Sequence, residues 1–279
     1  MSHVLIAGCG DLGARIGRRF RELGDDVWGL RRSASAIPAE FQPIVADLTD
    51  PDTLRDLPPA LDRVVYAVSA GGFAVENYRA AYVDGVRNLL DALDSRDPFP
   101  TFLFISSTSV YGQRDGEWVD EDSATAPEHF SGTTMLEGEE LAKSVGGTAF
   151  RLAGIYGPGR TRLLDRVRAG DAKCTPTENF LNLIHVEDAA QAVVHIADRQ
   201  DRADTYNVVD NAPTNRNEVI TWLATQLGLP EPPIGDDPNT ASRVFRTNKR
   251  TNNTQLRTTR FEPQYPTYKE GYAELLEGS

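Results

Sequence analysis

The sequence predicts an α/β fold, a Rossmann-type doubly wound parallel sheet, and two observations predict it. Short apolar runs typical of buried strands alternate with stretches of helical periodicity through the first half of the chain. A glycine-rich turn joins the first strand to the first helix. After Gly157 the texture changes, because prolines and short polar runs become common. We therefore expect a smaller C-terminal substrate lobe beside the sheet.

The individual elements follow from these patterns. Strands are predicted over 4–7, 26–30, 43–46, 63–69, 101–106 and 148–152. Helices are predicted over 12–23, 50–57, 77–93 and 135–144. Gly24 follows the first helix as a C-terminal stop. Strands that alternate with helices indicate a parallel sheet covered on both faces.

The same patterns divide the chain into two parts. Residues 1–157 form the predicted dinucleotide-binding domain, and residues 182–210 return to it. Within that return, the segment 182–197 and a strand over 205–209 are expected to rejoin the main sheet. Residues 158–181 and 211–279 form the smaller substrate-facing lobe, with helices over 217–227 and 268–276.

Composition excludes several classes of function. The chain has 279 residues, 40% of them hydrophobic, and a net charge of −12, which disfavours nucleic acid as a partner. No apolar run is long enough for a membrane span, and no signal peptide is visible, so we expect a cytoplasmic protein. Cys9 and Cys174 are expected to be small buried residues rather than a disulfide. The histidines and cysteines show no metal-ligand spacing.

The glycine-rich turn is the strongest candidate for a binding site. Gly8, Gly10 and Gly13 form a G-x-G-x-x-G pattern between a strand and a helix, and Asp11 and Leu12 belong to the same loop. Such glycines permit a tight turn, close approach of a pyrophosphate and close packing of helix on strand. The helix N-terminus then offers free N–H groups to the phosphates. A dinucleotide cofactor is therefore predicted here.

The end of the second strand bears on which dinucleotide is bound. Arg31 and Arg32 stand where many such domains carry an acidic residue for the ribose hydroxyls. Arginine there suits a 2′-phosphate, which favours NADP, with NAD possible. The alternative is that both arginines are ordinary solvated surface charges.

Several motifs in order resemble the extended short-chain dehydrogenase/reductase family, which contains sugar-nucleotide epimerases and dehydratases. Besides the glycine loop they lie at residues 46–48, 82–90, 106–112 (S-S-T-S-V-Y-G), 151–159 (ending Y-G-P-G), 184–190 and 206–208. Residues 248–266 resemble a poorly characterised atypical branch of this family. The resemblance implies a small-molecule substrate such as a sugar nucleotide, and homodimers are common in the family.

The resemblance also implies roles for particular residues. Asp47 and Leu48 would lie at the adenine, and residues 67–71 would line the cofactor, among them Val68, Ser69 and Ala70. Ser107 matches the family's catalytic serine or threonine, which hydrogen-bonds the reacting oxygen.

The chain departs from the family at its central acid/base. The family's tyrosine and the lysine four residues later correspond to Ser131 and Met135, and the helix asparagine corresponds to Tyr82. A serine without an adjacent base is a poor proton carrier, and methionine supplies no charge to tune it. A literal Y-x-x-x-K at Tyr265 to Lys269 contains proline, and we interpret its tyrosines as packing residues.

Four residues are candidates to replace the missing tyrosine: Tyr82, Tyr111, His129 and Tyr156. Tyr111 follows the catalytic strand and is retained as a catalytic candidate, although the alternative is a packing role. His185 is expected to be a cap or packing residue. The acidic run from Glu117 to Asp122 is expected to be a solvated loop.

Two functions remain open. The first is an NADP-dependent oxidoreductase or epimerase with an unconventional proton carrier. Its substrate phosphate could be held by Arg160 and Arg162, or by Arg243 or Lys249. The alternative is that these residues are ordinary surface charges. The second is a catalytically lapsed sensor or regulatory module that still holds NADP(H).

Overall fold

The computed structural model describes residues 1–235 and 247–277, which divide into two compact units. Unit 1 comprises Met1–Val110, Pro127–Arg151 and Ala190–Tyr206. Unit 2 comprises Tyr111–Ala126, Leu152–Ala189 and the described part of Asn207–Ser279. The units interleave along the chain, and each is described separately below.

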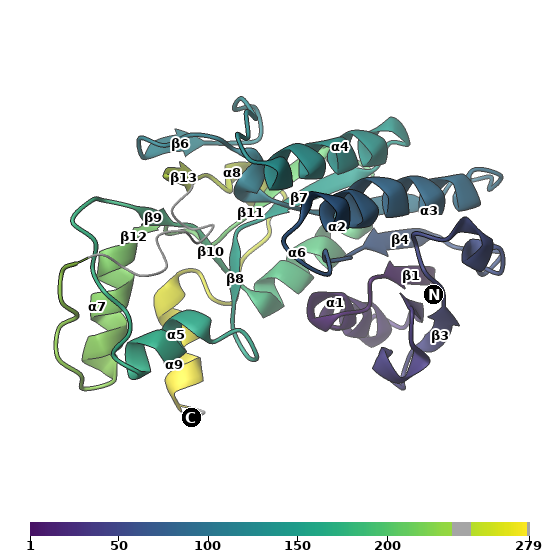
Figure 1. Ribbon diagram of the computed structural model, residues 1–279. Coiled ribbons are helices and arrows are strands. Elements are labelled where there is room, and N and C mark those ends of the chain that lie inside the picture. Colours follow the sequence, from purple (N-terminus) through teal and green to yellow (C-terminus); the bar gives the residue numbers. More distant parts are fainter. Residues whose placement is uncertain (236–246, 278–279) are drawn as a thin grey trace. The chain divides into compact units, whose positions relative to one another are not determined.

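A seven-stranded sheet forms the core of unit 1 (Figure 1), in the order β11-β7-β5-β4-β1-β2-β3. Its strands are β1 (His3–Ala7), β2 (Asp26–Arg31), β3 (Gln42–Val45), β4 (Arg63–Tyr66), β5 (Thr101–Ser107), β7 (Thr148–Leu152) and β11 (Thr205–Val208). The pairings from β3 through β2, β1 and β4 to β5 are all parallel. The predicted doubly wound parallel sheet is confirmed, and so is the return of the strand near residue 205.

Helices of unit 1 pack on this sheet because each has one apolar face. They are α1 (Asp11–Glu22), α2 (Val75–Arg79), α3 (Gly85–Leu93) and α4 (Phe130–Ser144). Helix α1 buries Leu12, Ile16 and Phe20 against β1 and β2. Helix α4 packs on β5 and on α2 and α3. The β1 strand is apolar throughout its buried part, which suits a strand covered on both faces.

Three predicted helices differ from those observed. The stretch 77–93 begins earlier, at Val75, and is interrupted by a π-helical turn, η3 (Ala80–Asp84). The stretch 50–57 is a single 3₁₀ turn, η2 (Pro51–Leu54), because Asp50 caps it and Pro51 begins it. Helix α4 starts five residues before the predicted residue 135. The prediction missed its first turn because polar and β-branched residues there have low helix propensity.

Unit 2 is built from short strand pairs and helices. The pairs are β8 (Gly154–Tyr156) with β10 (Leu183–His185), β9 (Phe180–Leu181) with β12 (Thr214–Asn215), and β6 (Glu117–Val119) with β13 (Lys249–Thr251). The segment near residue 183 therefore pairs with β8 and not with the main sheet, which corrects the expectation for 182–185. The start of the acidic run is strand β6 rather than a loop, because its backbone pairs with β13.

The helices of unit 2 enclose a core of their own. They are α5 (Arg162–Arg168), α7 (Arg216–Gln226), α8 (Thr254–Thr258) and α9 (Tyr268–Glu277), and α6 (Val186–Ala197) begins in this unit and ends in unit 1. Leu164 of α5, Leu223 of α7 and Tyr272 of α9 meet in this core with Tyr156. Tyr268 is also buried there, which confirms its predicted packing role.

The strand order places the sheet's topological switch point between β1 and β4. From β1 the chain proceeds to β2 and β3 on one side, whereas β4 and β5 lie on the other. In doubly wound sheets, ligands bind beyond the carboxyl ends of the strands at this point. The glycine loop follows β1 and the segment 67–70 follows β4, so both lie at the switch point.

Candidate functional site

The glycine loop has the backbone form that a pyrophosphate requires. Gly8 has φ +89°, and its N–H donates to the carbonyl oxygen of Leu30 at 3.2 Å. A Cβ on Gly13 would lie 2.4 Å from the Gly8 carbonyl oxygen, so only glycine allows α1 to pack there. A Cβ on Gly10 would meet nothing within 4 Å. The open side at Gly10 therefore leaves room for a ligand against the first turn of α1.

The first turn of α1 completes this loop. Gly10 is the N-cap and makes no side-chain hydrogen bond to the turn, so the cap itself does not compete with an anion for the N–H groups of the helix N-terminus. Asp11 forms an ion pair with Arg15, with Oδ1 2.9 Å from Nε. Leu12 is buried, so its side chain supports the packing of the helix rather than facing a ligand.

Arg31 lies beside the glycine loop. Its Nη1 donates to the carbonyl oxygens of Cys9 at 3.3 Å and Ala36 at 3.0 Å. Burial raises the pKa of the Cys9 thiol to about 11, despite the opposing charge of Arg31. Arg31 is therefore fixed at the end of β2 next to the loop, whereas Arg32 is exposed.

The residues expected at the adenine form a tight turn after β3. Asp47 Oδ1 accepts hydrogen bonds from the Thr49 N–H at 2.9 Å and the Thr49 hydroxyl at 2.7 Å. These bonds lower the pKa of Asp47, with a smaller contribution from the charge of Arg32. The carbonyl oxygen of Leu48 accepts from Nδ2 of Asn88 at 2.8 Å, which ties the turn to α3.

The segment after β4 reaches the glycine loop and helix turn η3. A Cβ on Gly8 would lie 2.6 Å from the Val68 N atom, so the two loops are in direct contact. The N–H of Ala70 donates to the Tyr82 hydroxyl at 3.3 Å. Ser69 lies between these contacts. Tyr82, at which the resemblance predicts an asparagine, thus holds the loop that was expected to line the cofactor.

Ser107 ends β5, and the first turn of α4 packs on the turn that follows it. The hydroxyl of Ser107 accepts from the Ser109 N–H at 3.2 Å. A Cβ on Gly132 would lie 2.6 Å from the Ser109 carbonyl oxygen. Strand β5 and the start of α4 are thus brought together around Ser107.

Ser131 and Met135, at which the resemblance predicts a tyrosine and a lysine, lie in this part of α4. Ser131 is 7% exposed and Met135 5% exposed. The Ser131 hydroxyl lies 3.0 Å from Nδ1 of His129, and the Ser131 N–H also donates to that nitrogen at 3.3 Å. The backbone donor requires Nδ1 to be an acceptor, so the neutral ring carries its proton on Nε2. A histidine base therefore lies beside the serine, which the sequence analysis did not pair with it.

A buried ionic network holds α4 to the sheet. Glu139 is 2% exposed and Arg151 is 4% exposed, and Arg151 Nη2 donates to Glu139 Oε2 at 2.8 Å. Arg151 Nε donates to Glu139 Oε1 at 3.0 Å. The hydroxyl of Ser106 also donates to Glu139 Oε1, at 2.5 Å. The network therefore links the residue before Ser107 to α4 and β7.

Tyr111 is buried in unit 2, with no exposed surface. Its hydroxyl lies 2.8 Å from the carbonyl oxygen of Asp120 and 2.9 Å from Oδ1 of Asn207. Both neighbours belong to unit 2, and they occupy the hydroxyl. These contacts favour the packing role that was the alternative for this residue.

The other candidates in unit 2 are also packing residues. His185 has no exposed surface, and its Nδ1 accepts from the Glu187 N–H at 3.4 Å, as expected of a cap. Tyr265 lies against the His185 ring with centroids 3.8 Å apart, and burial raises its pKa to about 12. Burial also raises the pKa of Tyr156, which makes it a poor proton donor near neutral pH.

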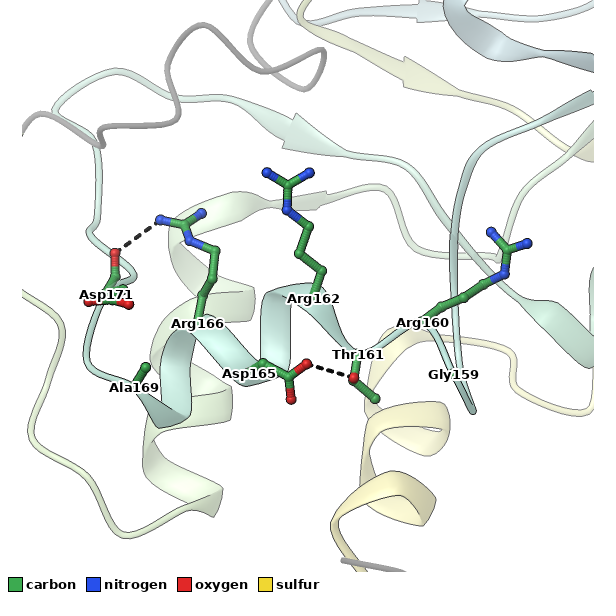
Figure 2. Close-up of a pocket in the computed structure, with 8 residues that line it drawn as sticks. All are labelled: Gly159, Arg160, Thr161, Arg162, Asp165, Arg166, Ala169 and Asp171. Atoms are coloured by element: carbon green, nitrogen blue, oxygen red, sulfur yellow. Dashed lines mark hydrogen bonds between the residues drawn. The ribbon is translucent and has the colours of Figure 1, made fainter. Parts of the chain in front are cut away.

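An open hollow of about 540 Å³ lies at α5 (Figure 2). Arg160, Arg162 and Arg166 line it, and the side chains of Arg162 and Arg166 extend from the same side of the helix. Arg166 donates to the Asp171 carbonyl oxygen at 3.0 Å. Asp165 and Asp171 line the hollow as well. Arg160 and Arg162, which the sequence offers as holders of a substrate phosphate, thus lie in the same hollow, and that role stays a prediction. Arg243, named with them, lies outside the described residues.

The described helices and the two cysteines bear on membrane insertion and on disulfide formation. None of the described helices combines the length and apolar character that crossing a membrane needs. Cys9 and Cys174 are both free and buried, as expected.

Comparison with known proteins agrees with the fold. A solved structure from Methylobacillus flagellatus, a candidate NAD-dependent epimerase/dehydratase, is 35% identical with a TM-score of 0.83, and covers 99% of this chain and 98% of that one. MoeE5 in complex with UDP-glucose and NAD is 22% identical with a TM-score of 0.78, and covers 99% and 98% of the two chains. The latter likeness concerns the fold alone.

Sequence comparison identifies the family. Protein YeeZ of Escherichia coli (strain K12) is 32% identical over 250 residues, which are 84% of this chain and 86% of YeeZ. The family model described as "NAD dependent epimerase/dehydratase family" matches residues 4–209, which include the glycine loop, Ser107 and the start of α4. The family's description implies a nicotinamide cofactor. This chain belongs to the NAD dependent epimerase/dehydratase family.

Proposed function

We propose that this protein is an enzyme that binds NADP in preference to NAD and oxidises or reduces a carbon of a sugar nucleotide or a related hydroxyl-bearing molecule. One observation carries the proposal: the glycine loop at the switch point keeps open space at Gly10 beside uncapped N–H groups of α1. A glycine loop that served only as a turn would not need both features. The same loop supports cofactor binding by this chain's own residues.

The residues present fit a dinucleotide. The first turn of α1 would hold the pyrophosphate, and Val68, Ser69 and Ala70 would line the cofactor where Tyr82 fixes their backbone. When bound, the nicotinamide ring supplies or accepts the hydride. The protein's part is to position substrate and cofactor, to stabilise charge on the reacting oxygen and to move a proton.

The preference for NADP rests on Arg31. Its guanidinium lies beside the glycine loop, held by the carbonyl oxygens of Cys9 and Ala36. A guanidinium fixed at the end of β2 suits bidentate recognition of a 2′-phosphate. Positions 31 and 32 both carry arginine, and neither carries the acidic residue that would suit the free ribose hydroxyls of NAD.

The proton carrier that we propose is the Ser131–His129 pair. The ring of His129 can accept the Ser131 hydroxyl proton at Nδ1, and an adjacent base is what makes a serine hydroxyl reactive. Ser107 is the donor to the reacting oxygen, because its hydroxyl uses only an acceptor position toward Ser109. The pair replaces the tyrosine and lysine of the family with a serine and a histidine.

The substrate class is supported by relatives. MoeE5, which shares this fold, binds UDP-glucose together with NAD. In this chain the hollow at α5 offers Arg160 and Arg162 to a substrate phosphate. These observations support a sugar nucleotide and leave its base and sugar to experiment.

The test separates binding from chemistry. NADPH and NADH are titrated by calorimetry, and a panel of sugar nucleotides is then assayed for single-turnover change of NADPH absorbance. We expect tighter NADPH binding and turnover of at least one substrate. Binding without turnover across the panel would instead favour the catalytically lapsed sensor. Absence of binding to either cofactor would overturn both.

Variants of the proton carrier sharpen the result. His129→Ala and Ser131→Ala should each lower the single-turnover rate by about 10²–10⁴-fold, the usual contribution of general acid–base catalysis. NADPH affinity should change little. His195→Ala, in the last turn of α6, is the control and should retain the rate. If His129→Ala and Ser131→Ala react as fast as His195→Ala, the Ser131–His129 pair is not the proton carrier.

A further inference from the structure

The imidazole of His129 packs against two phenylalanine rings at the start of α4. The Phe73 ring lies against it with centroids 5.1 Å apart and planes 17° from parallel. The Phe130 ring lies 4.3 Å from the imidazole, at an interplanar angle of 42°. The two phenylalanine rings also contact each other, with centroids 5.1 Å apart. The three rings therefore form one cluster within unit 1.

Tyr78 joins this cluster to helix α2. Its side chain is buried, and its ring meets Phe73 and Phe130 edge-on, at interplanar angles of 88° and 87°. The centroids lie 5.7 and 5.3 Å apart, which is a favourable separation for edge-to-face pairs. Helix α2 itself packs on α4. The phenylalanine rings therefore rest on two packed helices.

Phe73 is an unusual residue for the loop that carries it. The side chain is 41% exposed, and it follows Gly71 and Gly72. Glycines lose more conformational freedom on ordering than other residues, so an ordered loop here carries an entropic cost. A side chain that stays so exposed recovers only part of the gain from burying a phenylalanine. Burial alone therefore does not account for Phe73, whereas its ring contacts give it a role beside His129.

The hydrogen bonds of His129 select one nitrogen but hold the ring loosely. The Ser131 N–H donates to Nδ1 at 3.3 Å, which is longer than the usual range of about 2.7–3.2 Å for a backbone donor. The Ser131 hydroxyl lies 3.0 Å from the same nitrogen. Rotation of the imidazole about its Cβ–Cγ bond would carry Nδ1 away from both groups. The plane of the ring must therefore be held by other contacts, and the near-parallel Phe73 ring supplies one.

We infer that Phe73 is a positioning residue, which stacks on His129 and holds Nδ1 toward the Ser131 hydroxyl. A base that activates a serine is commonly oriented by a third group, and here that group is an aromatic ring. Stacking resists rotation of the imidazole out of its plane and leaves the ring edge, where the nitrogens lie, to hydrogen bonds. The part of this arrangement in proton transfer rests on the proposed function, whereas the position of the ring does not.

The experiment measures hydrogen exchange of the Ser131 amide by NMR in the full-length protein, without cofactor. Phe73→Leu keeps an apolar side chain and removes the planar ring, whereas Phe73→Tyr keeps the ring. Val75→Ala is the matched control, because Val75 is a similarly exposed apolar residue of the same segment. The Thr133 N–H, which donates to the His129 carbonyl oxygen at 3.2 Å, reports fraying of α4 in each variant.

We expect the Ser131 amide of Phe73→Leu to exchange about 3–10-fold faster than in the wild type, which is the worth of one aromatic pair. Exchange at Thr133 should change by less than about twofold. Phe73→Tyr and Val75→Ala should both exchange like the wild type. Because Phe73 lies on an exposed loop, thermal melting of these variants should stay close to that of the wild type. If Phe73→Leu unfolds, Phe73→Met is used in its place.

The same variants are then assayed for turnover. The single-turnover rate of Phe73→Leu should fall by a factor similar to its gain in Ser131 exchange, with NADPH affinity unchanged. Phe73→Tyr should restore the rate. A wild-type protein that turns over no substrate would overturn the proposed function and leave the exchange result intact, so the two failures are distinguishable.

Three results would overturn the inference. One is Ser131 exchange in folded Phe73→Leu or Phe73→Met that rises by less than about threefold. Another is an equal rise at Thr133 or in Val75→Ala, which would mean that the whole start of α4 frays. The third is faster Ser131 exchange with an unchanged single-turnover rate, which would show that the position of the imidazole has no part in proton transfer.

Discussion

The glycine loop and the start of α4 both belong to unit 1, yet they differ in how closely they match the motifs that the family resemblance predicts. The loop keeps Gly8, Gly10 and Gly13 with the conformation and close packing that a dinucleotide needs. The start of α4 carries Ser131 and Met135 at the positions where the resemblance predicts a tyrosine and a lysine. The helix nevertheless packs on β5 as a sheet-covering helix should.

Cofactor binding at the glycine loop depends mainly on backbone atoms, whereas proton transfer at α4 depends on side chains. A pyrophosphate is held by backbone N–H groups and by the absence of side chains, so the loop tolerates few substitutions. Proton transfer depends on one side chain and on the groups that tune its pKa. The side chain can therefore change while the helix that carries it remains in place.

The largest expected effect concerns the scaffold of α4. Glu139→Ala should lower the free energy of unfolding by about 3–5 kcal/mol, because it leaves the buried Arg151 without its carboxylate. Glu137→Ala is the matched control on the same helix, since its ion pair with Arg79 is partly exposed and worth about 0–1 kcal/mol. Urea unfolding measures both. Equal losses would mean that the Glu139 network does not anchor the helix.

The next effect tests the loop without disturbing the fold. Gly10→Ala meets no atom within 4 Å, so its unfolding midpoint should stay close to that of the wild type. A pyrophosphate against α1 would collide with the new methyl group, so NADPH affinity should fall at least tenfold, about 1.4 kcal/mol. Gly235→Ala serves as control, since its nearest neighbour would be Lys173 Cδ at 3.7 Å. Unchanged NADPH affinity in Gly10→Ala would place the phosphates elsewhere.

A third change separates the two cofactors. Arg31→Ala should weaken NADPH about tenfold or more, because a charge-assisted hydrogen bond is worth about 1.5–3 kcal/mol. NADH affinity should fall less, because for NADH the variant loses only the hydrogen bond from Arg31 to the Cys9 carbonyl oxygen, which supports the glycine loop. Arg55→Ala removes an exposed arginine and should affect neither cofactor. Equal losses for NADPH and NADH in Arg31→Ala would contradict the assignment of the 2′-phosphate to Arg31.

The smallest effect concerns the segment after β4, which contacts the glycine loop. Tyr82→Phe removes the hydrogen bond from the Ala70 N–H, worth about 0.5–1.5 kcal/mol, so NADPH affinity should fall only a few-fold. The single-turnover rate should fall by no more than the same factor. A much larger loss of rate would make Tyr82 the proton carrier in place of Ser131 and His129.

Local sequence determined the glycine loop, most strands and the fold class. A glycine pattern, a strand of apolar residues and a helical period each act over a few neighbouring residues, so they can be recognised without a structure. The interrupted helix at 75–93 and the early start of α4 are harder to predict from the sequence, because a π-helical turn and a polar first turn leave no clear helical periodicity.

Side-chain environment was decided by the tertiary structure. Nothing local to Tyr111 indicates that Asn207 would occupy its hydroxyl, or that Glu139 would meet Arg151 in the core. Strand β13, which carries the buried Lys249, likewise pairs with β6, far away in the sequence. Burial and long-range hydrogen bonds exist only after the chain has brought distant segments together, and these contacts determine which polar groups are free to act.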